Sequence, residues 1–280
     1  MASFLVAHEP AIRLGIFAGI LALMAGWETL APRRNRAVPR LTRWPGNLGL
    51  ALVNTLLLRA VFPAAVVGFA AAGELRGMGL LNNLDLPAWS RIVIAFVLLD
   101  LAIYLQHVMF HAVPALWRLH RVHHADLDFD VTTGVRFHPL EIVLSLAIKL
   151  AAIAALGAPA FAVLAFEVAL NATSLFNHGN VGLPGGLDRM LRWIVVTPDM
   201  HRVHHSVVPR ETNSNFGFNL PWWDRLLGTY RAQPAGGHEG MTIGLDIFRD
   251  PAQLRLDRLL VQPFVEPAPS RPGGRRRLAS

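Results

Sequence analysis

The chain carries histidines at short spacings that place imidazole rings on one side of a helix. His107 and His111 form an H-x3-H pair. An H-x2-H-H box comes next and is repeated 81 residues later; the two boxes consist of His120, His123, His124, His201, His204 and His205. Residues at positions i, i+3 and i+4 share one face of a helix, so each group can aim several imidazole nitrogens at one point. Because imidazole binds zinc, copper, iron and nickel, the spacing indicates a metal site.

The number of these histidines indicates two metal ions. With 12 histidines in 280 residues, one H-x2-H-H box is expected by chance in roughly 2% of chains this long, and two boxes far less often. One zinc ion takes about four ligands, fewer than the histidines available here. His178, in the segment FNHGN, is a further candidate. The predicted metal ligands are therefore His107, His111, His120, His123, His124, His178, His201, His204 and His205.

Polar residues near the boxes are predicted to orient the ligating rings. An imidazole that binds a metal usually donates its second N–H to a carboxylate, a carbonyl or water. We assign this role to His138, Asp100, Asp199 and Asn180. The other carboxylates near the boxes are expected to act in the same way; they are Asp126, Asp128, Asp130 and Glu211.

Apolar runs must position these groups, and five of them are long enough to cross a bilayer, which takes roughly 20 residues. The runs cover residues 11–30, 46–73, 88–111, 140–156 and 159–176. Gly157-Ala158-Pro159 predicts that the last two form either a tight helical hairpin or a re-entrant pair. Five such runs argue against buried helices of a soluble core. The sequence predicts an all-α, polytopic membrane protein of about four to five spans with a histidine-rich helical cap.

The composition agrees with a membrane protein and excludes several chemistries. Hydrophobic residues make up 53% of the chain and charged residues 16%, against about 25% charged in an average soluble domain. There is no cysteine, which excludes disulfides, cysteine nucleophiles and iron–sulfur clusters within this chain. The net charge is +7, and the arginines gather beside apolar runs. This placement favours a membrane surface over nucleic acid.

The distribution of arginine predicts the orientation. Five arginines lie between the first two runs, whereas the loop between the second and third runs has only Arg76. Loops rich in lysine and arginine stay in the cytoplasm, so the N-terminus is predicted outside. The third run then ends in the cytoplasm at the first boxes, and the hairpin returns the chain to the same side before His201. We expect a multi-pass protein of a bacterial inner membrane whose active site faces the cytoplasm.

Charged and aromatic residues within or beside the runs have two readings each. Arg59, Asp100, Lys149 and Glu167 lie inside apolar runs, where charges are costly and often functional. Arg59 and Lys149 can alternatively extend to the membrane surface. The run from Trp222 to Arg225 is either an interfacial aromatic anchor or a wall that keeps water from the metals.

The boxes belong to longer segments that resemble the fatty acid hydroxylase and sterol desaturase superfamily of membrane non-haem di-iron oxygenases. The matching segments are D-x3-Y-x2-H at 100–107, HAVPALWRLHRVHH at 111–124, RFHPLE at 136–141, NHGN at 177–180, TPDMHRVHHS at 197–206 and NSNFGFNLPWWDRLLGTY at 213–230. Ser174 stands where some members have a further histidine. The resemblance implies two irons held by the predicted ligands. It also implies that O2 is used to hydroxylate or desaturate a sterol-like, acyl or isoprenoid membrane lipid during lipid biosynthesis.

Such an oxidoreductase needs electrons from outside this chain. There is no cysteine for an iron–sulfur centre and no G-x-G-x-x-G segment for a flavin or nicotinamide. We therefore expect a ferredoxin- or cytochrome-type donor with its reductase. The candidates for docking it are Arg118, Arg121, Arg202 and the arginines at 275–277. The alternative is that these arginines hold the protein against anionic lipid.

The predicted organisation is membrane spans over residues 1–87, a catalytic domain over 88–264 and a disordered basic tail over 265–280. The alternative function is a non-catalytic membrane protein that binds or transports metal. Transport would place the ligands near the middle of the bilayer on broken helices. A zinc-dependent lipid hydrolase is a third reading, but the chain has no H-E-x-x-H motif.

Overall fold

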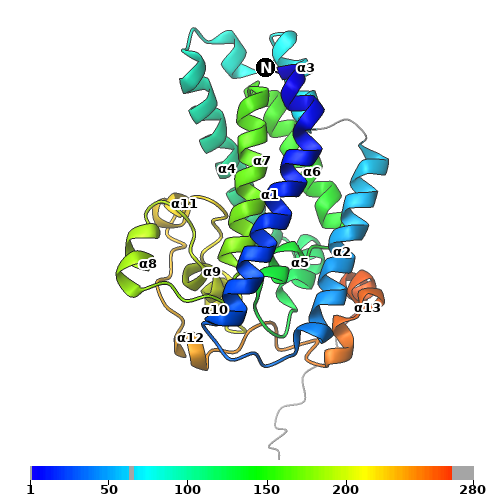
Figure 1. The fold of residues 1–280 in the computed structure, drawn as a ribbon, viewed down its shortest axis with the longest axis vertical. Helices are drawn as coiled ribbons and strands as arrows, with labels where there is room; N and C mark the ends of the chain where they lie inside the picture. The colour runs from blue at the N-terminus through cyan, green and yellow to red at the C-terminus, as the bar shows by residue number, and fades with distance from the viewer. Residues whose placement is uncertain (1, 63–65, 267–280) are drawn as a thin grey trace, which may run out of the picture.

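The computed structural model describes residues 2–62 and 66–266 and shows an all-helical chain (Figure 1). Within these residues there is no β-strand, only two isolated bridges. The longer helices are α1 (Ala2–Leu30), α2 (Arg40–Val61), α3 (Val66–Leu75), α4 (Ala88–Ala112), α5 (Pro114–His124), α6 (Pro139–Leu156) and α7 (Ala160–Asn177). The shorter ones are η1 (Leu80–Asn83), η2 (Val131–Val135), α8 (Gly185–Leu191), α9 (Pro198–His204), α10 (Pro209–Thr212), α11 (Trp222–Leu226), α12 (Gly237–Gly240), η3 (Pro251–Leu254), α13 (Leu256–Val261) and η4 (Gln262–Phe264).

Five helical segments are long and apolar enough to cross a membrane, which confirms the predicted class. They are His8–Leu30, Arg40–Asn83, Ala88–Ala112, Pro139–Leu156 and Ala160–Asn177. The second segment begins six residues before the predicted run and contains α2, α3 and η1. Positions 63–65, between α2 and α3, lie outside the described residues. The predicted tail lies outside them from residue 267 onward.

The predicted hairpin between α6 and α7 is confirmed. Gly157 ends α6 in the left-handed conformation with φ of 65°, and Pro159 caps α7. Gly79 packs against this turn so closely that a Cβ atom on it would lie 2.1 Å from the Gly157 nitrogen. The turn therefore needs glycine at both positions, because Gly79 also has a positive φ of 86°.

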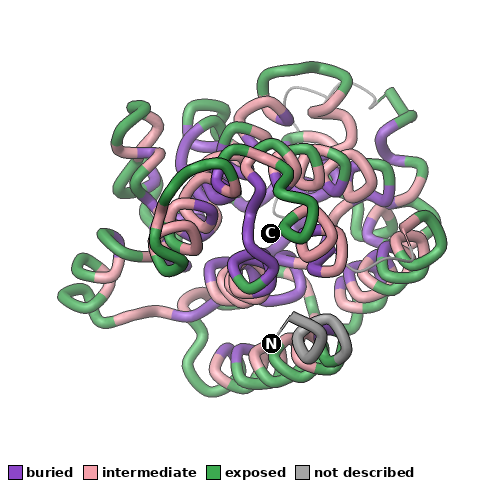
Figure 2. The backbone as a smooth tube through the Cα atoms, turned by 90° about the horizontal axis from the view of Figure 1, so that it is seen from above, coloured by how far each residue is buried: buried purple, intermediate pink, exposed green. Residues whose placement is uncertain are grey.

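The bundle is built around α7, against which α1, α3 and α4 pack. Its core contains Leu99, Val163 and Phe166, and Figure 2 shows the buried backbone at the centre with exposed helix faces outside. Apolar residues such as Leu23 and Leu105 point outward from the spans. Outward-facing leucines on helices of this length are expected where lipid replaces water.

The charges inside the bundle are mostly paired. Lys149 Nζ lies 2.5 Å from Glu167 Oε1, and Arg13 Nη2 lies 2.9 Å from Glu167 Oε2. Lys149 thus binds a neighbouring helix instead of extending to the membrane surface. Arg59 is exposed in the last turn of α2, as expected for an arginine that does reach the surface.

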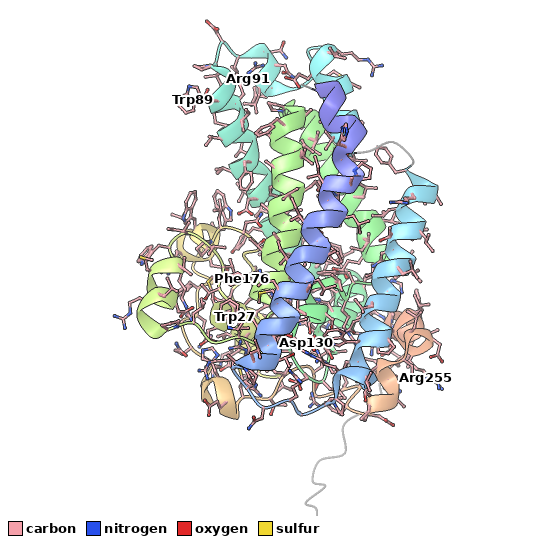
Figure 3. The ribbon with its side chains drawn as sticks, in the orientation of Figure 1. Trp27, Trp89, Arg91, Asp130, Phe176 and Arg255 are labelled. Carbon is pink, nitrogen blue, oxygen red and sulfur yellow. The ribbon has the colours of Figure 1, made fainter. Side chains whose placement is uncertain are left out.

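Apart from η1, which lies beside the turn between α6 and α7, the short helices form a cap at the end of the bundle where α4 and α7 finish (Figures 1 and 3). The fully buried Arg43 of α2 joins this cap through Asp126 (Nε to Oδ1, 2.8 Å) and Asp130 (Nη1 to Oδ2, 2.6 Å). Burial alone would raise the pKa of Asp126, but Arg43 and Arg136 hold that pKa well below its usual range. These carboxylates therefore fix the cap to α2 and do not bind the imidazoles.

Candidate metal centre

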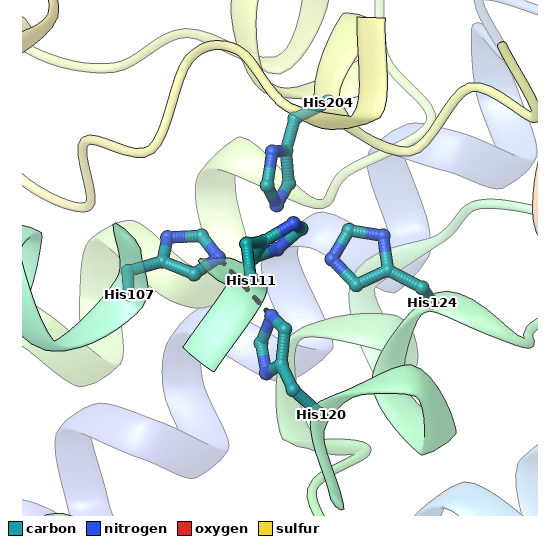
Figure 4. A group of neighbouring side chains, drawn as sticks. All are labelled: His107, His111, His120, His124 and His204. Atoms are coloured by element: carbon teal, nitrogen blue, oxygen red, sulfur yellow. Dashed lines mark hydrogen bonds between the residues drawn. The ribbon is translucent and has the colours of Figure 1, made fainter. Parts of the chain in front are cut away.

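All nine histidines predicted as ligands lie in two adjacent groups. The five-histidine group contains His107, His111, His120, His124 and His204, and the four-histidine group contains His123, His178, His201 and His205. Within each group, one ligand atom from every ring lies within 4.8 Å of all the others. Figure 4 shows the rings of the five-histidine group arranged around a common centre. Segments up to about 100 residues apart in the chain thus meet at one place.

Each H-x2-H-H box contributes to both groups. In the first box His120 and His124 lie in the five-histidine group, while His123 lies in the other. The second box reverses this division, since His201 and His205 belong to the four-histidine group and His204 to the five. The groups touch where the rings of His124 and His205 stack, with centroids 4.6 Å apart. Each copy of the duplicated motif therefore supplies ligands to both sites.

Local structure explains how the second box is held. Thr197 caps α9 by accepting a hydrogen bond from the Met200 backbone N–H, and Pro198 takes the first helical position, as the sequence predicted. His178 follows the last residue of α7. His107 and His111 occupy the final turns of α4, so every group lies at the same end of the bundle.

Four of the nine rings donate Nδ1–H to a backbone carbonyl. The acceptors are Phe216 O for His107 (2.7 Å), Ser174 O for His178 (2.7 Å), Ser214 O for His204 (2.8 Å) and Arg136 O for His123 (3.3 Å). A carbonyl oxygen can only accept, so the proton must reside on Nδ1 of these rings. In a neutral imidazole the lone pair is then on Nε2, which points into the group.

Two more rings are bound by side chains. His120 Nδ1 lies 2.7 Å from Glu141 Oε1, and His111 Nδ1 lies 3.2 Å from Asn213 Oδ1. Oxygens again accept, so Nε2 of both rings carries the lone pair. A carboxylate partner makes an imidazole a more basic ligand, and Glu141 therefore distinguishes His120 from the other rings.

The inward nitrogens need a cation between them. His107 Nε2 lies 3.1 Å from His120 Nε2, and His178 Nε2 lies 3.1 Å from Nε2 of both His123 and His201. With the protons on Nδ1 of His107, His120, His123 and His178, the contacts between those rings bring two lone pairs together. Such an arrangement is repulsive unless a positive ion lies between the nitrogens.

Other buried nitrogens in the groups have no hydrogen-bond partner in the described chain. They are His111 Nε2, His204 Nε2, His201 Nδ1 and both ring nitrogens of His124 and His205. Leaving a buried polar atom unpaired is costly. Two nitrogens bound to one metal at about 2.1 Å each lie at most about 4.2 Å apart, close to the 4.8 Å limit of each group. The residues therefore fit metal ions.

Burial keeps these imidazoles neutral. It lowers the pKa of His178 to about 3 and places the pKa of His123, His124, His201, His204 and His205 well below the usual value. Neighbouring imidazoles lower these values further. Neutral rings offer lone pairs at physiological pH, as metal binding requires.

Two of the residues predicted to orient the rings are used elsewhere. His138 accepts a hydrogen bond from the Leu140 N–H with Nδ1 and contacts Leu260 O with Nε2 at 3.1 Å, so both nitrogens are occupied. Asp199 pairs with Arg202 and with Arg33 (3.4 Å). His138 caps α6, and Asp199 holds charges at the outside of α9.

Asp100 and Asn180, the other two residues predicted to orient the rings, bind segments that are distant in the sequence. Asp100 Oδ2 accepts hydrogen bonds from Trp223 Nε1 (2.8 Å) and the Leu220 N–H (3.3 Å). Asn180 binds the backbone of Arg34 through both ends of its amide. Neither contacts an imidazole among the described residues, so their assigned role is not supported. Asp128 and Glu211 likewise accept from backbone N–H groups, those of Ala37, Val38 and Ala235.

The residues that do orient rings by their side chains, Glu141 and Asn213, were missed. Both lie in segments that carry the family resemblance, RFHPLE and NSNFGF. The signal was therefore present, but a motif does not say which of its polar residues faces the histidines.

Aromatic rings enclose much of the centre. Phe137 stacks on His123 with centroids 4.4 Å apart, and Phe216 and Phe218 lie 5.4 and 5.1 Å from His107. These phenylalanines form the wall that the Trp222–Arg225 run was suggested to supply. His111 is the one member of the two groups that is not fully buried.

The arginines expected to dock an electron donor are mostly inaccessible. Arg202 is fully buried, and Arg121 is buried while donating to the Gln262 and Val265 carbonyls. Arg118 is half-exposed and binds Glu266. Arg121 and Arg202 hold the cap together, so these two docking predictions were wrong; the arginines at 275–277 lie outside the described residues.

Known proteins are similar to this part of the chain. The family model for fatty acid hydroxylase matches residues 92–229, which include all nine histidines. Ornithine lipid hydroxylase of Rhizobium tropici is 34% identical over 53% of this chain and 44% of its own length. Alkylglycerol monooxygenase of Xenopus tropicalis is 28% identical over 60% of this chain and 36% of its own. Cholesterol 25-hydroxylase of Rattus norvegicus is 28% identical over 67% of this chain and 61% of its own length.

The match thus spans between a third and two thirds of these relatives' lengths. No solved structure matches the chain. The family model and the relatives agree with the resemblance seen in the motifs, and they coincide with the segment that holds the two histidine groups. The part of the chain that matches the fatty acid hydroxylase family is therefore residues 92–229.

Proposed function

We propose that this protein is an O2-dependent oxidoreductase that hydroxylates a membrane lipid with two non-haem irons. The observation that carries the proposal is the set of nine imidazoles in two touching groups, six of which use Nδ1 for hydrogen bonds to oxygen and turn Nε2 inward. The relatives named above are hydroxylases and a monooxygenase that their names link to lipids, which favours hydroxylation over desaturation.

Iron is favoured over zinc because zinc has no redox chemistry of its own. Two bound irons would supply the reduction of O2 and the oxidation of a C–H bond. The nine predicted histidines would hold them. The hydrogen bonds at Nδ1 fix each ring's orientation, and Glu141 makes His120 a stronger donor than a ring bonded to a carbonyl.

The protein's own contribution is to bring a lipid chain to the centre while excluding water. The histidine groups lie at the ends of α4 and α7, both candidate spans. A hydrocarbon chain can therefore approach from the bilayer without crossing water. Phe216 and Phe218 line the centre on the side of α4, and an apolar wall there suits an alkyl or acyl chain.

Electrons would come from a ferredoxin- or cytochrome-type protein and its reductase. Hydroxylation follows RH + O2 + 2e− + 2H+ → ROH + H2O, and no described group of this chain supplies the electron pair. His111 is the one ring of the two groups that is only partly buried, and we propose that electrons enter the five-histidine group near it. We further propose a bacterial inner membrane with this side facing the cytoplasm, supported by the arginines between the first two spans.

The test is metal analysis together with lipid analysis of the same preparation. Anaerobically purified protein should contain about two irons per chain, and lipids from cells that express it should include a species with one added oxygen atom. Expression of His204→Ala should abolish this species. Bound iron with no oxidised lipid under any electron supply would favour the metal-binding alternative. Full activity with zinc alone would overturn the proposal.

A further inference from the structure

Two short segments beside α4 expose apolar side chains that no described residue covers. We call residues 185–194 and 220–230, which include α8 and α11, the side lobe. Seven of its large apolar residues are between 40% and 73% exposed; they are Leu187, Met190, Trp193, Ile194, Trp222, Leu226 and Leu227. A cluster of this kind marks an interaction surface, since soluble surfaces seldom expose so many large apolar residues together.

Hydrogen bonds to α4 define the position of the side lobe along the axis of that helix. Asp100 is the middle residue of α4, 12 residues from either end and thus about 18 Å from each along the axis. Its carboxylate binds Trp223 and Leu220 of the side lobe. About one turn nearer the histidines, the Tyr104 hydroxyl lies 2.8 Å from Thr229 Oγ1. The side lobe therefore rises beside α4 to its midpoint.

The midpoint of α4 falls inside the hydrocarbon core of the bilayer. The hydrocarbon core is about 30 Å thick, and the 25 residues of α4 extend about 37 Å. A helix that spans the membrane has hydrocarbon around its middle, so residues bonded to Asp100 lie at hydrocarbon depth. Figures 1 and 3 show α8 and α11 beside the lower half of the bundle, above α12.

Several polar groups of the side lobe have partners within the protein. Trp222 Nε1 donates to Trp193 O at 2.8 Å, and the Arg225 guanidinium lies 4.0 Å from the Trp193 ring centre while Nη2 donates to Arg192 O. Arg192 Nε lies 2.7 Å from Asp188 Oδ2. Internal partners are what a segment in hydrocarbon needs, because lipid offers none.

Arg189 is the remaining basic residue of the α8 segment, and it is exposed. A long arginine side chain can carry its charge to the phosphate layer while its stem stays among apolar groups. One such residue is compatible with a segment near the membrane surface.

We propose that the side lobe is embedded in the membrane leaflet on the histidine side, with lipid hydrocarbon covering its exposed apolar residues. The evidence that selects lipid over a protein partner is the depth set by the contacts of the side lobe with Asp100 and Tyr104. The inference does not depend on the proposed enzymatic activity. It adds a non-spanning membrane contact to the five candidate spans.

The absence of cysteine makes a direct test possible. Single variants Met190→Cys, Ile194→Cys and Leu226→Cys are spin-labelled in vesicles of phosphatidylethanolamine and phosphatidylglycerol. Collisions with O2, which concentrates in hydrocarbon, are compared with collisions with a water-soluble nickel chelate. The lipid-facing control is Leu105→Cys on α4, 51% exposed, and the aqueous control is Arg255→Cys, 73% exposed and labelled in Figure 3.

The proposal predicts that the side-lobe labels resemble the Leu105 label, with O2 collisions favoured several-fold over the Arg255 label. Labels that meet the nickel chelate as readily as the Arg255 label would overturn it. Labels shielded from both reagents, with spin–spin broadening between chains, would also overturn it by showing a second copy on this surface. Three positions are used so that one poorly folded variant leaves the others to decide.

Discussion

At the residue scale, the direction of each imidazole follows from the partner of its second nitrogen. A carbonyl or carboxylate at Nδ1 removes the choice of tautomer and leaves Nε2 as the only lone pair. His107 and His204 are set in this way by the carbonyls of Phe216 and Ser214, which belong to one loop. That loop therefore orients one ligand from the first histidine pair, His107, and one from the last box, His204.

The first prediction concerns one ligand from each group. His204→Ala removes a ring from the five-histidine group and His123→Ala one from the four-histidine group, so each variant should lose iron and lipid oxidation together. Loss of at least one iron per chain is expected from elemental analysis of folded protein. The matched control is His8→Ala near the N-terminal end of α1, away from the histidine groups, and this variant should keep both irons. Equal iron content in all three variants would contradict the ligand assignment.

The second prediction concerns the carboxylate on His120. Glu141→Gln keeps the size of the side chain but removes the charge that makes the ring more basic, so iron affinity should fall roughly 10- to 100-fold. Iron retention during titration with a chelator measures this effect. Glu211→Gln is the matched control, because Glu211 is also buried but accepts from the Ala235 N–H. Identical chelator curves for the two variants would show that Glu141 has no effect on the metal.

At the element scale, local patterns predicted the helices well, whereas long-range contacts were beyond reach. Apolar length predicted the spans, and Thr197 with Pro198 predicted the start of α9 because a helix cap depends on adjacent residues. The partner of His107 lies 109 residues away, and no local rule identifies it. His138 was predicted to orient a ligand because it is a histidine close to the boxes in sequence, but in the structure it caps α6.

The third prediction concerns the turn between α6 and α7. Gly79→Ala would place a Cβ atom 2.1 Å from the Gly157 nitrogen at a positive φ, so the free energy of unfolding should fall by about 1–3 kcal/mol or more. Thermal unfolding of detergent-purified protein measures the loss. Gly185→Ala is the control, since a Cβ there meets nothing within 4 Å. Because the turn lies at the opposite end from the histidines, folded Gly79→Ala protein should keep its iron.

At the scale of the whole molecule, the first 87 residues are bonded into the histidine cap. Glu28 of α1 accepts hydrogen bonds from the backbone N–H groups of Val131 and Asn180, both at 2.7 Å. Arg43 of α2 is buried against Asp126. The division at residue 87 stays a prediction about sequence relationships, and these contacts indicate that the two parts fold together.

The fourth prediction concerns topology. With five spans and the arginines of the first loop in the cytoplasm, reporter fusions after Arg43, His124 and Pro209 should read cytoplasmic, and a fusion after Asp85 should read exterior. The two boxes meet in one centre, so the His124 and Pro209 fusions must agree whatever the overall orientation. A uniform inversion of all four signals would reverse the proposed orientation but leave the centre intact.

The last prediction is that turnover requires an external reductant. Each hydroxylation consumes two electrons that the substrate does not provide, and the chain has no cysteine for an iron–sulfur cluster. Arg121 and Arg202 are buried and cannot contact a donor directly, so we expect electrons to enter near His111, the one ring that is only partly buried. In vesicles that hold the iron-loaded protein and its lipid, oxidised product should stay below one equivalent per chain until a carrier and reductase are added. Product formed over many turnovers with O2 alone would contradict the monooxygenase stoichiometry, since no other source of the electron pair is present.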